Sequence, residues 1–554
     1  MSSHSDLLAA QIQAAISHAI ERGDLIGTVP ANIPLERPKN RDHGDYASSI
    51  ALQLAKPAGK NPREVAELLK KDLEKLPEVS SVDIAGPGFI NIKLNRASQA
   101  DLVRTILSAK ESYGKGSALA GVKINLEFIS ANPTGPLHLG HTRWAAVGDA
   151  LGRVLSAAGA EVVREFYIND RGNQMDLFGQ SVQAAALGQP IPEDGYQGDY
   201  ILDLAKQVLT ENPDISKLED EPRLIAFREA AYKLQLKDQQ RVLDTFNTHF
   251  DVWFSERSLH DGGSVEHGLD KLRSQGHVFE IDGATWLRTT DFGDDKDRVL
   301  VKANGDLTYF SSDTAYYINK RERGFDICIY MLGADHHGYI HRLKATAACA
   351  GDDPEYNVHV LIGQLVKIME GGEEVKLSKR AGTIITLEEL VEKVGVDAAR
   401  YTLIRYPVDT PMVMDVDVLR SRTNENPVYY VQYAHARVCA VLRNATDIGI
   451  KYGAQLIYPE LLVHEREREL IGALGEFPRV VAGAAELREP HRVARYVEEL
   501  AGVYHRFYAD CRVLPLGDET PSELHSARAT LCSATAQVIS NGLELLGVSA
   551  PEKM

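Results

Sequence analysis

The histidine pair His138 and His141 occurs where a predicted strand gives way to a predicted helix, after a turn at 130–136. Residues three apart on a first helical turn face the same side, so both imidazoles can donate hydrogen bonds to one ligand. A helix N-terminus adds free backbone N–H groups and the positive end of the helix dipole, which suit a phosphate. Gly140 removes a side chain where a flat base would approach the backbone. The pattern predicts a nucleotide site; the alternative is that two histidines and a glycine fall at this spacing by chance.

A basic loop follows about 240 residues later, with Lys376, Lys379 and Arg380 ahead of Gly382. Clustered cations on a glycine-bounded loop are suited to a polyphosphate. Taken alone, the segment is better explained as a solvated basic loop. Its combination with the histidine pair is what favours a phosphate site.

A third cluster, Asp335, His336, His337 and His341, follows a late predicted strand. His337 and His341 are spaced i, i+4, and with Asp335 they offer ligands that suit Zn²⁺. No HExxH motif or further ligand cluster accompanies them, so we expect no resident metal ion.

Apolar periodicity defines the elements that position these residues. Alternation over 122–128 predicts a strand, and 139–158 has helical periodicity that Gly159 ends. A second strand at 162–168 gives the order strand, helix, strand, which predicts a parallel unit with a right-handed crossover. Ligands of such sheets bind at the carboxyl ends of the strands, where the histidine pair lies. Later predicted elements are a helix at 175–187, a strand at 327–332, a helix from about 338 and a strand at 358–368.

Three domains are predicted along the chain. Helices at 47–54 and 62–73 and a hairpin at 82–94 suggest a small N-terminal α/β domain, 1–112, ending in a linker. Residues 113–395 form an α/β Rossmann-like catalytic domain around a parallel sheet, with a mostly helical insertion at about 190–300. Residues 396–554 form a C-terminal all-α domain.

Composition limits the classes of protein that fit. The chain has 554 residues, enough for two to four domains. Its net charge of -17 argues against unselective nucleic-acid binding and leaves room for a local basic groove. Five dispersed cysteines without a CxxC pair fit a reducing cytosol. With neither a membrane-length apolar run nor a signal peptide, we expect a cytoplasmic protein that has no membrane partner. We also expect a monomer.

Together, the histidine and lysine motifs resemble those of the class I aminoacyl-tRNA synthetases. In that family they hold ATP, which acts with Mg²⁺, while an amino-acid carboxylate attacks the α-phosphate. The resemblance implies catalytic roles for His138, His141, Lys376 and Lys379 and ATP contacts for His138, Gly140, His141, Asp335, His336 and Lys379. The family pattern ends in Ser where this chain has Arg380, so the role of Arg380 stays open.

More specifically, the chain resembles arginyl-tRNA synthetases at both ends and in the middle. The similar segments are 43–46 (HGDY), 85–91 (AGPGFIN), 127–141, 167–174, 397–400 (DAAR) and 429–437. The resemblance implies that tRNA for arginine, ATP and L-arginine are the partners, and that arginine is esterified to tRNA through an arginyl-adenylate. It assigns anticodon binding to the C-terminal domain and the corner of the tRNA to the N-terminal domain.

Arginine places a specific demand on its pocket. A guanidinium has five donors and no acceptor, so the pocket must supply acceptors. By resemblance, Glu127, Asn132, Tyr309 and Asp313 surround the substrate. Asp313 is the first candidate for bidentate pairing with the guanidinium, and Glu127 or Asn132 for the α-amino group. The alternative for Asp313 is a capping or first-turn acid of the helix that follows.

Tyr433 and Arg437 are the predicted tRNA contacts, within a helical set that could stack on unpaired bases. We expect over half of that set to lie in the core. The whole set consists of Tyr429, Tyr430, Tyr433, Arg437, Tyr504, Arg506, Phe507 and Tyr508. Two other functions stay open. A nucleotidylyltransferase would share the histidine chemistry without needing the terminal domains, and a non-catalytic tRNA-binding relative would not need His138, His141 and Lys379.

Overall fold

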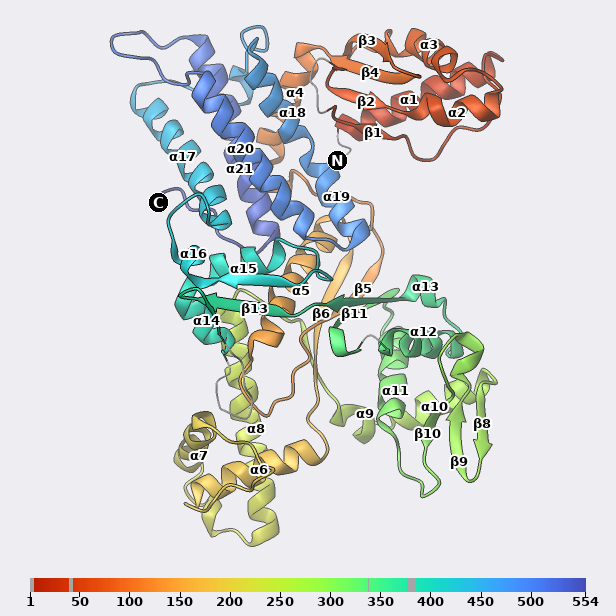
Figure 1. Ribbon diagram of the computed structural model, residues 1–554, viewed down its shortest axis with the longest axis vertical. Helices are drawn as coiled ribbons and strands as arrows, with labels where there is room; N and C mark the ends of the chain where they lie inside the picture. Colours follow the sequence, from red (N-terminus) through yellow and green to blue (C-terminus); the bar gives the residue numbers. More distant parts are fainter. Residues whose placement is uncertain (1–3, 39–42, 337, 376–384) are drawn as a thin grey trace.

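A five-stranded parallel sheet lies at the centre of the molecule (Figure 1). The computed structural model describes residues 4–38, 43–336, 338–375 and 385–554. In spatial order the strands are β12 (Val358–Gly363), β11 (Ile327–Gly333), β5 (Lys123–Glu127), β6 (Glu161–Ile168) and β7 (Val252–Ser255). Every neighbouring pair is parallel, so the carboxyl ends of all five strands lie along one edge. The predicted Rossmann-like sheet is confirmed.

Helix α5 (Leu139–Ala157) connects β5 to β6 and packs closely on the sheet. A Cβ atom at Gly148 would lie 2.3 Å from the Phe128 ring, so only glycine allows this approach. Gly159, with φ +99°, turns the chain into β6. The helix predicted at 139–158 and both flanking strands are therefore present.

The N-terminal residues form a four-stranded antiparallel sheet with its own hydrophobic core. Its strands are β1 (Leu35–Glu36), β2 (Tyr46–Ser48), β4 (Phe89–Leu94) and β3 (Val79–Ala85), and its helices are α1 (His4–Glu21), α2 (Ile50–Ala58) and α3 (Pro62–Leu73). The hairpin and α3 are as predicted. The helix predicted at 47–54 begins only at Ile50, because β2 pairs with β4 first. By packing, the next helix, α4 (Arg96–Ala109), belongs to the main core.

The range 190–300 is not the mostly helical insertion predicted from the sequence. Its first part is helical, whereas β7 is an edge strand of the central sheet, where Trp253 stacks on Phe166. A separate antiparallel sheet follows. Between residues 173 and 322, the elements other than β7 are α6 (Asn173–Ala186), α7 (Asp199–Glu211), η3 (Ile215–Lys217), α8 (Asp220–Thr245), α9 (Arg257–Asp261), α10 (Ser264–Ser274), β8 (Val278–Ile281), β9 (Ala284–Leu287), η4 (Thr289–Phe292), β10 (Arg298–Val301) and α11 (Tyr309–Glu322).

The single strand predicted at 358–368 is two strands in different sheets. The chain leaves β12 at Gly363, where a Cβ atom would lie 2.4 Å from the Trp144 ring, and enters β13 (Val366–Glu370). β13 lies between β14 (Glu373–Glu374) and β15 (Met412–Asp415). Two short helices, α12 (Tyr339–Cys349) and α13 (Pro354–Asn357), precede β12.

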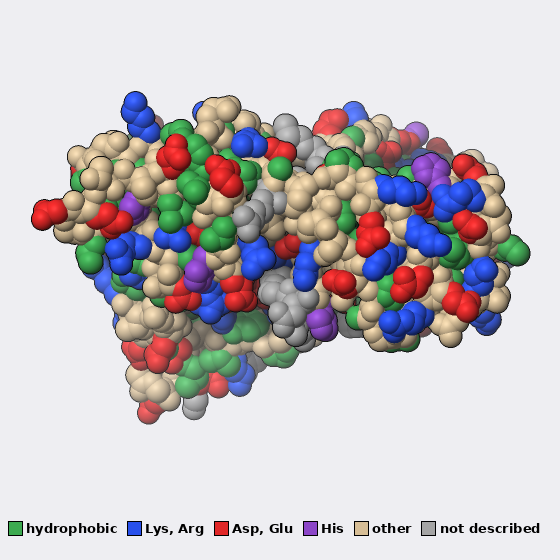
Figure 2. Space-filling view, turned by 90° about the horizontal axis from the view of Figure 1, so that it is seen from above, with side chains coloured by type: hydrophobic (Ala, Val, Ile, Leu, Met, Phe, Trp, Pro, Cys, Tyr) green, Lys and Arg blue, Asp and Glu red, His purple; other side chains and the backbone are tan. Residues whose placement is uncertain are grey.

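Helices dominate the rest of the chain, as predicted, and stand beside the N-terminal domain (Figure 1). They are α14 (Leu387–Val394), α15 (Val396–Ile404), α16 (Val416–Arg420), α17 (Pro427–Asp447), α18 (Glu465–Gly475), α19 (Phe477–Leu487), α20 (His491–Asp510) and α21 (Glu523–Leu545). Among the described residues, no helix is long and apolar enough to cross a membrane. On the face seen from above, Lys and Arg side chains lie interspersed with Asp and Glu (Figure 2).

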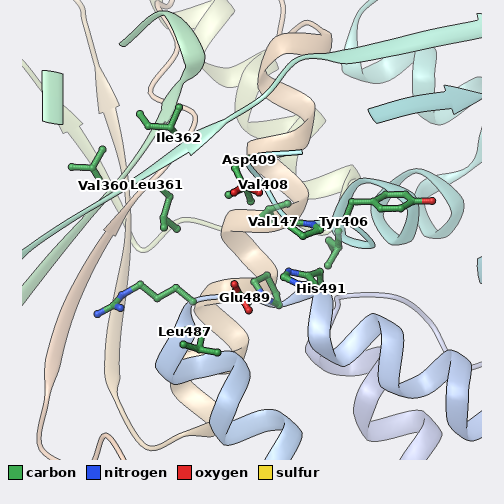
Figure 3. A pocket seen from close by; sticks show the side chains of 14 residues that line it. Val147, Val360, Leu361, Ile362, Tyr406, Val408, Asp409, Leu487, Glu489 and His491 are labelled. Carbon is green, nitrogen blue, oxygen red and sulfur yellow. The ribbon is translucent and has the colours of Figure 1, made fainter. Parts of the chain in front are cut away.

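A cavity of about 280 Å³ lies where the C-terminal helices meet the central sheet (Figure 3). Its walls come from α5, β12 and the segments 404–409 and 487–491. Val147, Ile362 and Val408 are among its apolar residues, and Asp409 and His491 are among its polar ones. None of its lining residues belongs to the site predicted from the sequence.

Candidate active site

The carboxyl edge of the central sheet gathers several acidic side chains. Glu127 ends β5, Glu256 follows β7, and Asp335 follows β11. Asp313 joins them from α11, and its electrostatic interaction with Glu127 and Glu256 indicates that the three carboxyl groups are close. The edge where ligands of such sheets bind is therefore strongly acidic.

His138 and His141 begin helix α5 and cap it reciprocally. His138 Nδ1 accepts a hydrogen bond from the Gly140 N–H at 3.1 Å, and His141 Nδ1 accepts one from the His138 N–H at 3.2 Å. Their ring centroids are 4.0 Å apart. Both imidazoles thus lie at one helix N-terminus, as the spacing predicted, where they can serve an anionic ligand.

The segment that follows the basic loop reaches the same helix N-terminus. The Leu139 N–H donates to the Ile385 carbonyl at 3.1 Å, and the Leu387 N–H donates to the Leu137 carbonyl at 2.8 Å. Lys376, Lys379 and Arg380 themselves lie outside the described residues. Backbone hydrogen bonds therefore hold the segment that follows the basic loop against the N-terminus of the helix that carries the histidine pair.

One face of α11 carries a series of polar side chains. Tyr309, Asp313, Tyr316 and Lys320 are spaced four, three and four residues apart, which places them along one side of a helix. The helix starts at Tyr309 with Thr308 as its N-cap residue, and its first turn holds no acid. Asp313 is therefore neither a cap nor a first-turn acid, which removes the alternative explanation for it.

Asp313 is a partly buried carboxyl group beside other carboxyl groups. Burial, together with Glu256 and Glu127, raises its pKa to about 7, and Arg342 opposes the rise only in part. The Tyr339 hydroxyl donates a hydrogen bond to it. Within the described parts of the chain, no cation lies within ion-pair distance of Asp313. Such a group is suited to a cation that the ligand brings.

Glu256 is a site residue that the sequence analysis missed. It is 6% exposed, and burial raises its pKa, with Asp170 adding to the rise and Arg171 and Tyr167 opposing it. The available signal was the run Val252–Ser255, a short apolar strand directly before an acid. The expectation that this range is mostly helical hides that signal.

Glu127 differs from its acidic neighbours because it has an internal cation. Lys320 Nζ lies 2.5 Å from its Oε2 atom, and the Ser130 hydroxyl donates to Oε1 at 3.1 Å. Ser130 adopts a left-handed backbone, with φ +48°, directly after the strand. The carboxylate of Glu127, at the end of β5, is therefore held from two sides.

The other predicted site residues differ in how they are placed. Asn132 is half-buried and donates a hydrogen bond to Gln174 at 2.5 Å. Tyr309 is 81% exposed, at the rim of the acidic group rather than inside it. Asp335 and His336 form an exposed pair, 3.6 Å apart, after β11. His337, which the zinc alternative requires, lies outside the described residues.

Arg143 fixes α5 against the sheet that leads to the basic loop. It is 3% exposed and donates hydrogen bonds to the carbonyls of Gln364, Pro407 and Thr410 at 3.0, 2.7 and 2.9 Å. Burial lowers its pKa to about 10. The helix that carries His138 is thereby tied to the start of β13.

Comparison with known families agrees with this geometry. The family model "tRNA synthetases class I (R), catalytic domain" matches residues 102–417. The chain belongs to the arginyl-tRNA synthetase family. The models "Arginyl tRNA synthetase N terminal domain" and "DALR anticodon binding domain" match residues 7–94 and 431–554.

Individual arginyl-tRNA synthetase relatives match over almost the full length. The chain is 54% identical to the arginine–tRNA ligase of Pseudarthrobacter chlorophenolicus over 553 residues, covering 99% of both chains. It is 55% identical to that of Renibacterium salmoninarum over 552 residues, covering 99% of this chain and 100% of the relative. Thermus thermophilus arginyl-tRNA synthetase shares the fold, with a TM-score of 0.76 at 23% identity, covering 99% of this chain and 100% of that one.

The helical surface of this family member presents several aromatic rings. Tyr433 is 37% exposed and stacks on Tyr429 with ring centroids 5.8 Å apart, and the Arg437 guanidinium lies 4.4 Å from the centre of the Tyr508 ring. Of the set predicted to be mostly core, Phe507 and Tyr504 are fully buried. Tyr430 and Tyr508 are partly buried against the core, and the other four members are less enclosed, so the prediction that over half of the set would be core is wrong.

Proposed function

We propose that this chain activates L-arginine with MgATP and transfers it to its cognate tRNA. The arginine carboxylate attacks the α-phosphorus, the bond to pyrophosphate breaks, and arginyl-adenylate forms. A hydroxyl of the terminal tRNA ribose then attacks the arginyl carbonyl, and AMP leaves. The observation that carries the proposal is the acidic group formed by Asp313, Glu256 and Glu127. It lies at the carboxyl edge of the central sheet, near the N-terminus of helix α5.

Different members of the acidic group bind the two cationic ends of arginine. Asp313 and Glu256 lack an internal ion pair among the described side chains, so they are suited to the guanidinium. Glu127, with Asn132 beside it on the same connection, is suited to the α-ammonium group. Tyr309, exposed at the first turn of α11, covers the aliphatic part of the substrate.

ATP is bound, on this proposal, at the N-terminus of α5. The N–H groups and dipole of that helix, with His138 and His141, stabilise the charge that develops on the phosphates. Gly140 leaves room for the base, while Asp335 and His336 contact the ribose side. Lys376 and Lys379 complete the phosphate contacts, an assignment that rests on the sequence motif alone.

On the tRNA side, we assign contacts to Tyr433 and Arg437, which their exposure supports. We assign the tRNA corner, catalysis and the anticodon to the domains 1–112, 113–395 and 396–554, although α4, in the first of these ranges, packs in the main core. Free, dispersed cysteines support a cytoplasmic location. Because one chain supplies the whole acidic group and the helical surface, a monomer suffices, and light scattering during size-exclusion chromatography checks this.

Transfer of each of the twenty labelled amino acids to total tRNA tests the proposal. We expect ATP-dependent and Mg²⁺-dependent charging with arginine alone. Charging with a different amino acid, and none with arginine, would end the substrate assignment. No charging by a folded, ATP-binding preparation would favour a non-catalytic relative.

A further inference from the structure

A fully buried lysine lies beside the proposed arginine site. Lys320, on α11, is 0% exposed, and Glu127 is its only ion-pair partner in the part of the chain that the structure describes. Its Nζ atom lies 4.3 Å from the centre of the Tyr316 ring and 4.0 Å from that of the Tyr330 ring. Burying a charged amine is costly, so a lysine in this position calls for an explanation.

The aromatic rings alone do not explain it. A cation–π contact stabilises an ion by less than its burial costs. The Tyr316 ring is itself held in place, since its hydroxyl donates to Glu165, which also pairs with Arg323 at 2.6 Å. Lys320 therefore lies between the two rings with its ammonium group on Glu127.

Glu127 is surrounded mainly by acidic and phenolic side chains. Several elements bring titratable or charged groups close to Glu127. They are Lys320, Asp313 and Tyr316 from α11, Tyr330 from β11, and Glu165 and Tyr167 from β6. Lys320 is the cation among them.

We propose that Lys320 is a positioning residue that holds the Glu127 carboxylate in the orientation that meets the α-ammonium group of arginine. The inference rests on the proposed role of Glu127 in binding arginine. It distinguishes two kinds of carboxyl group in one site. Glu127 is paired with a cation of the protein before the substrate arrives, whereas Asp313 is left for the cation of the guanidinium.

The substitution Lys320→Met keeps much of the length and removes the charge. We expect the arginine KM to rise about tenfold or more while kcat changes little, because the orientation of Glu127 affects substrate binding. The ATP KM should stay within about twofold, since a charge change of this kind acts on one substrate. Lys344→Met, which breaks an exposed pair with Glu355, is the matched control and should change neither KM.

Two further variants keep the outcome decisive. Lys320→Gln can still donate a hydrogen bond to Glu127, so it should restore part of the lost arginine affinity, and it keeps the test available if the methionine variant does not fold. Glu127→Gln should raise the arginine KM, and adding Lys320→Met to it should cause little further loss. A Lys320→Met defect confined to kcat, or one equally large in the Glu127→Gln background, would overturn the inference. An unchanged arginine KM in Glu127→Gln would instead overturn the proposed role of Glu127.

Discussion

Asp313 is a carboxyl group whose surroundings favour its proton until a cation arrives. Replacing it with Asn keeps its size and exchanges an acceptor oxygen for a donor amide, which faces a guanidinium unfavourably. We expect Asp313→Asn to lose about 2–5 kcal/mol of arginine binding, seen in kcat/KM for arginine, with little change for ATP. Citrulline, whose urea is neutral, should be discriminated against less by the variant than by the parent. An unchanged arginine-to-citrulline ratio would move the guanidinium partner to Glu256 or Glu127.

The pH dependence of arginine use should report the same group. Asp313 has a pKa near 7 without substrate, so a proton must leave before the guanidinium binds. We expect kcat/KM for arginine to rise as the pH passes through about 7 and then to level off, while the ATP KM stays flat. The inflection should disappear in Asp313→Asn. If the variant keeps the parent profile, another group controls the dependence.

The raised pKa of Asp313 also predicts how the stability of the substrate-free protein depends on pH. The folded-state pKa of Asp313 lies above its ordinary value of 3.8, so the charged form costs stability above pH 7, and that cost falls as the pH drops toward 4. Without substrate, Asp313→Asn should therefore raise Tm at pH 8 and have a smaller effect at pH 5. Thermal unfolding at the two pH values measures the difference, and equal shifts would count against an ionised, buried carboxylate.

At the scale of elements, Arg143 connects α5 to the strand that leads to the basic loop. Arg143→Met would leave three carbonyls without their donor, at about 1–3 kcal/mol for each one that stays buried. We expect a loss of about 3 kcal/mol or more in unfolding free energy and slower adenylate formation with a raised ATP KM. Arg241→Met, which removes exposed pairs with Asp238 and Glu388, should cost less than about 1 kcal/mol. A stable variant with normal ATP kinetics would show that the tie is dispensable.

Much of the fold could be predicted because local periodicity and tertiary structure agree there. The strands and helix on either side of His138 have clean alternation or helical spacing, and they lie where predicted. β7 was missed because a four-residue strand between helices carries too little periodicity to be distinguished from a helical face. The break between β12 and β13 at Gly363 could not be predicted, because Trp144, the side chain that crowds Gly363, is distant in sequence.

The candidate site was predictable in part for the same reason. Motif residues such as His138 and Asp313 could be identified because their spacing is local. Glu256 depends on recognising β7, and the pairing of Lys320 with Glu127 joins residues 193 positions apart. The helical spacing from Tyr309 to Lys320 predicts that these residues lie on one face of a helix. It does not predict which side chains they contact across the site.

At the scale of the whole molecule, a buried ion pair joins the catalytic and helical parts. Arg400 is 0% exposed, pairs with Asp149 on α5 at 2.6 Å, and donates to the carbonyls of Phe246 and Leu546. A Cβ atom at Gly547 would lie 2.2 Å from this guanidinium, which shows how closely the last helix approaches. The segment 397–400 (DAAR), which resembles a segment of the arginyl-tRNA synthetases, thus has a structural role at the point where three parts of the chain meet.

Removing this guanidinium should separate the unfolding of those parts. We expect Arg400→Met to cost about 3–5 kcal/mol, because Asp149 and the carbonyls stay buried with fewer partners. Urea unfolding followed by tryptophan fluorescence and circular dichroism should change from coincident to separate transitions. Arg492→Met, which breaks a surface pair with Glu489, is the control and should leave the transitions together. Coincident transitions in Arg400→Met would mean that apolar packing alone joins the parts.

The position of α4 has a consequence for how the chain is made. Its apolar residues Leu102, Val103 and Ile106 lie in the main core, against α18 and α21, and Asn541 donates to the Lys110 carbonyl 431 positions away. A ribosome adds roughly 5–20 residues per second, so α4 leaves the exit tunnel roughly 20–90 s before α21. Through most of synthesis, the nascent chain therefore exposes a helical face whose permanent cover does not yet exist. That face is a natural target for a chaperone acting during translation.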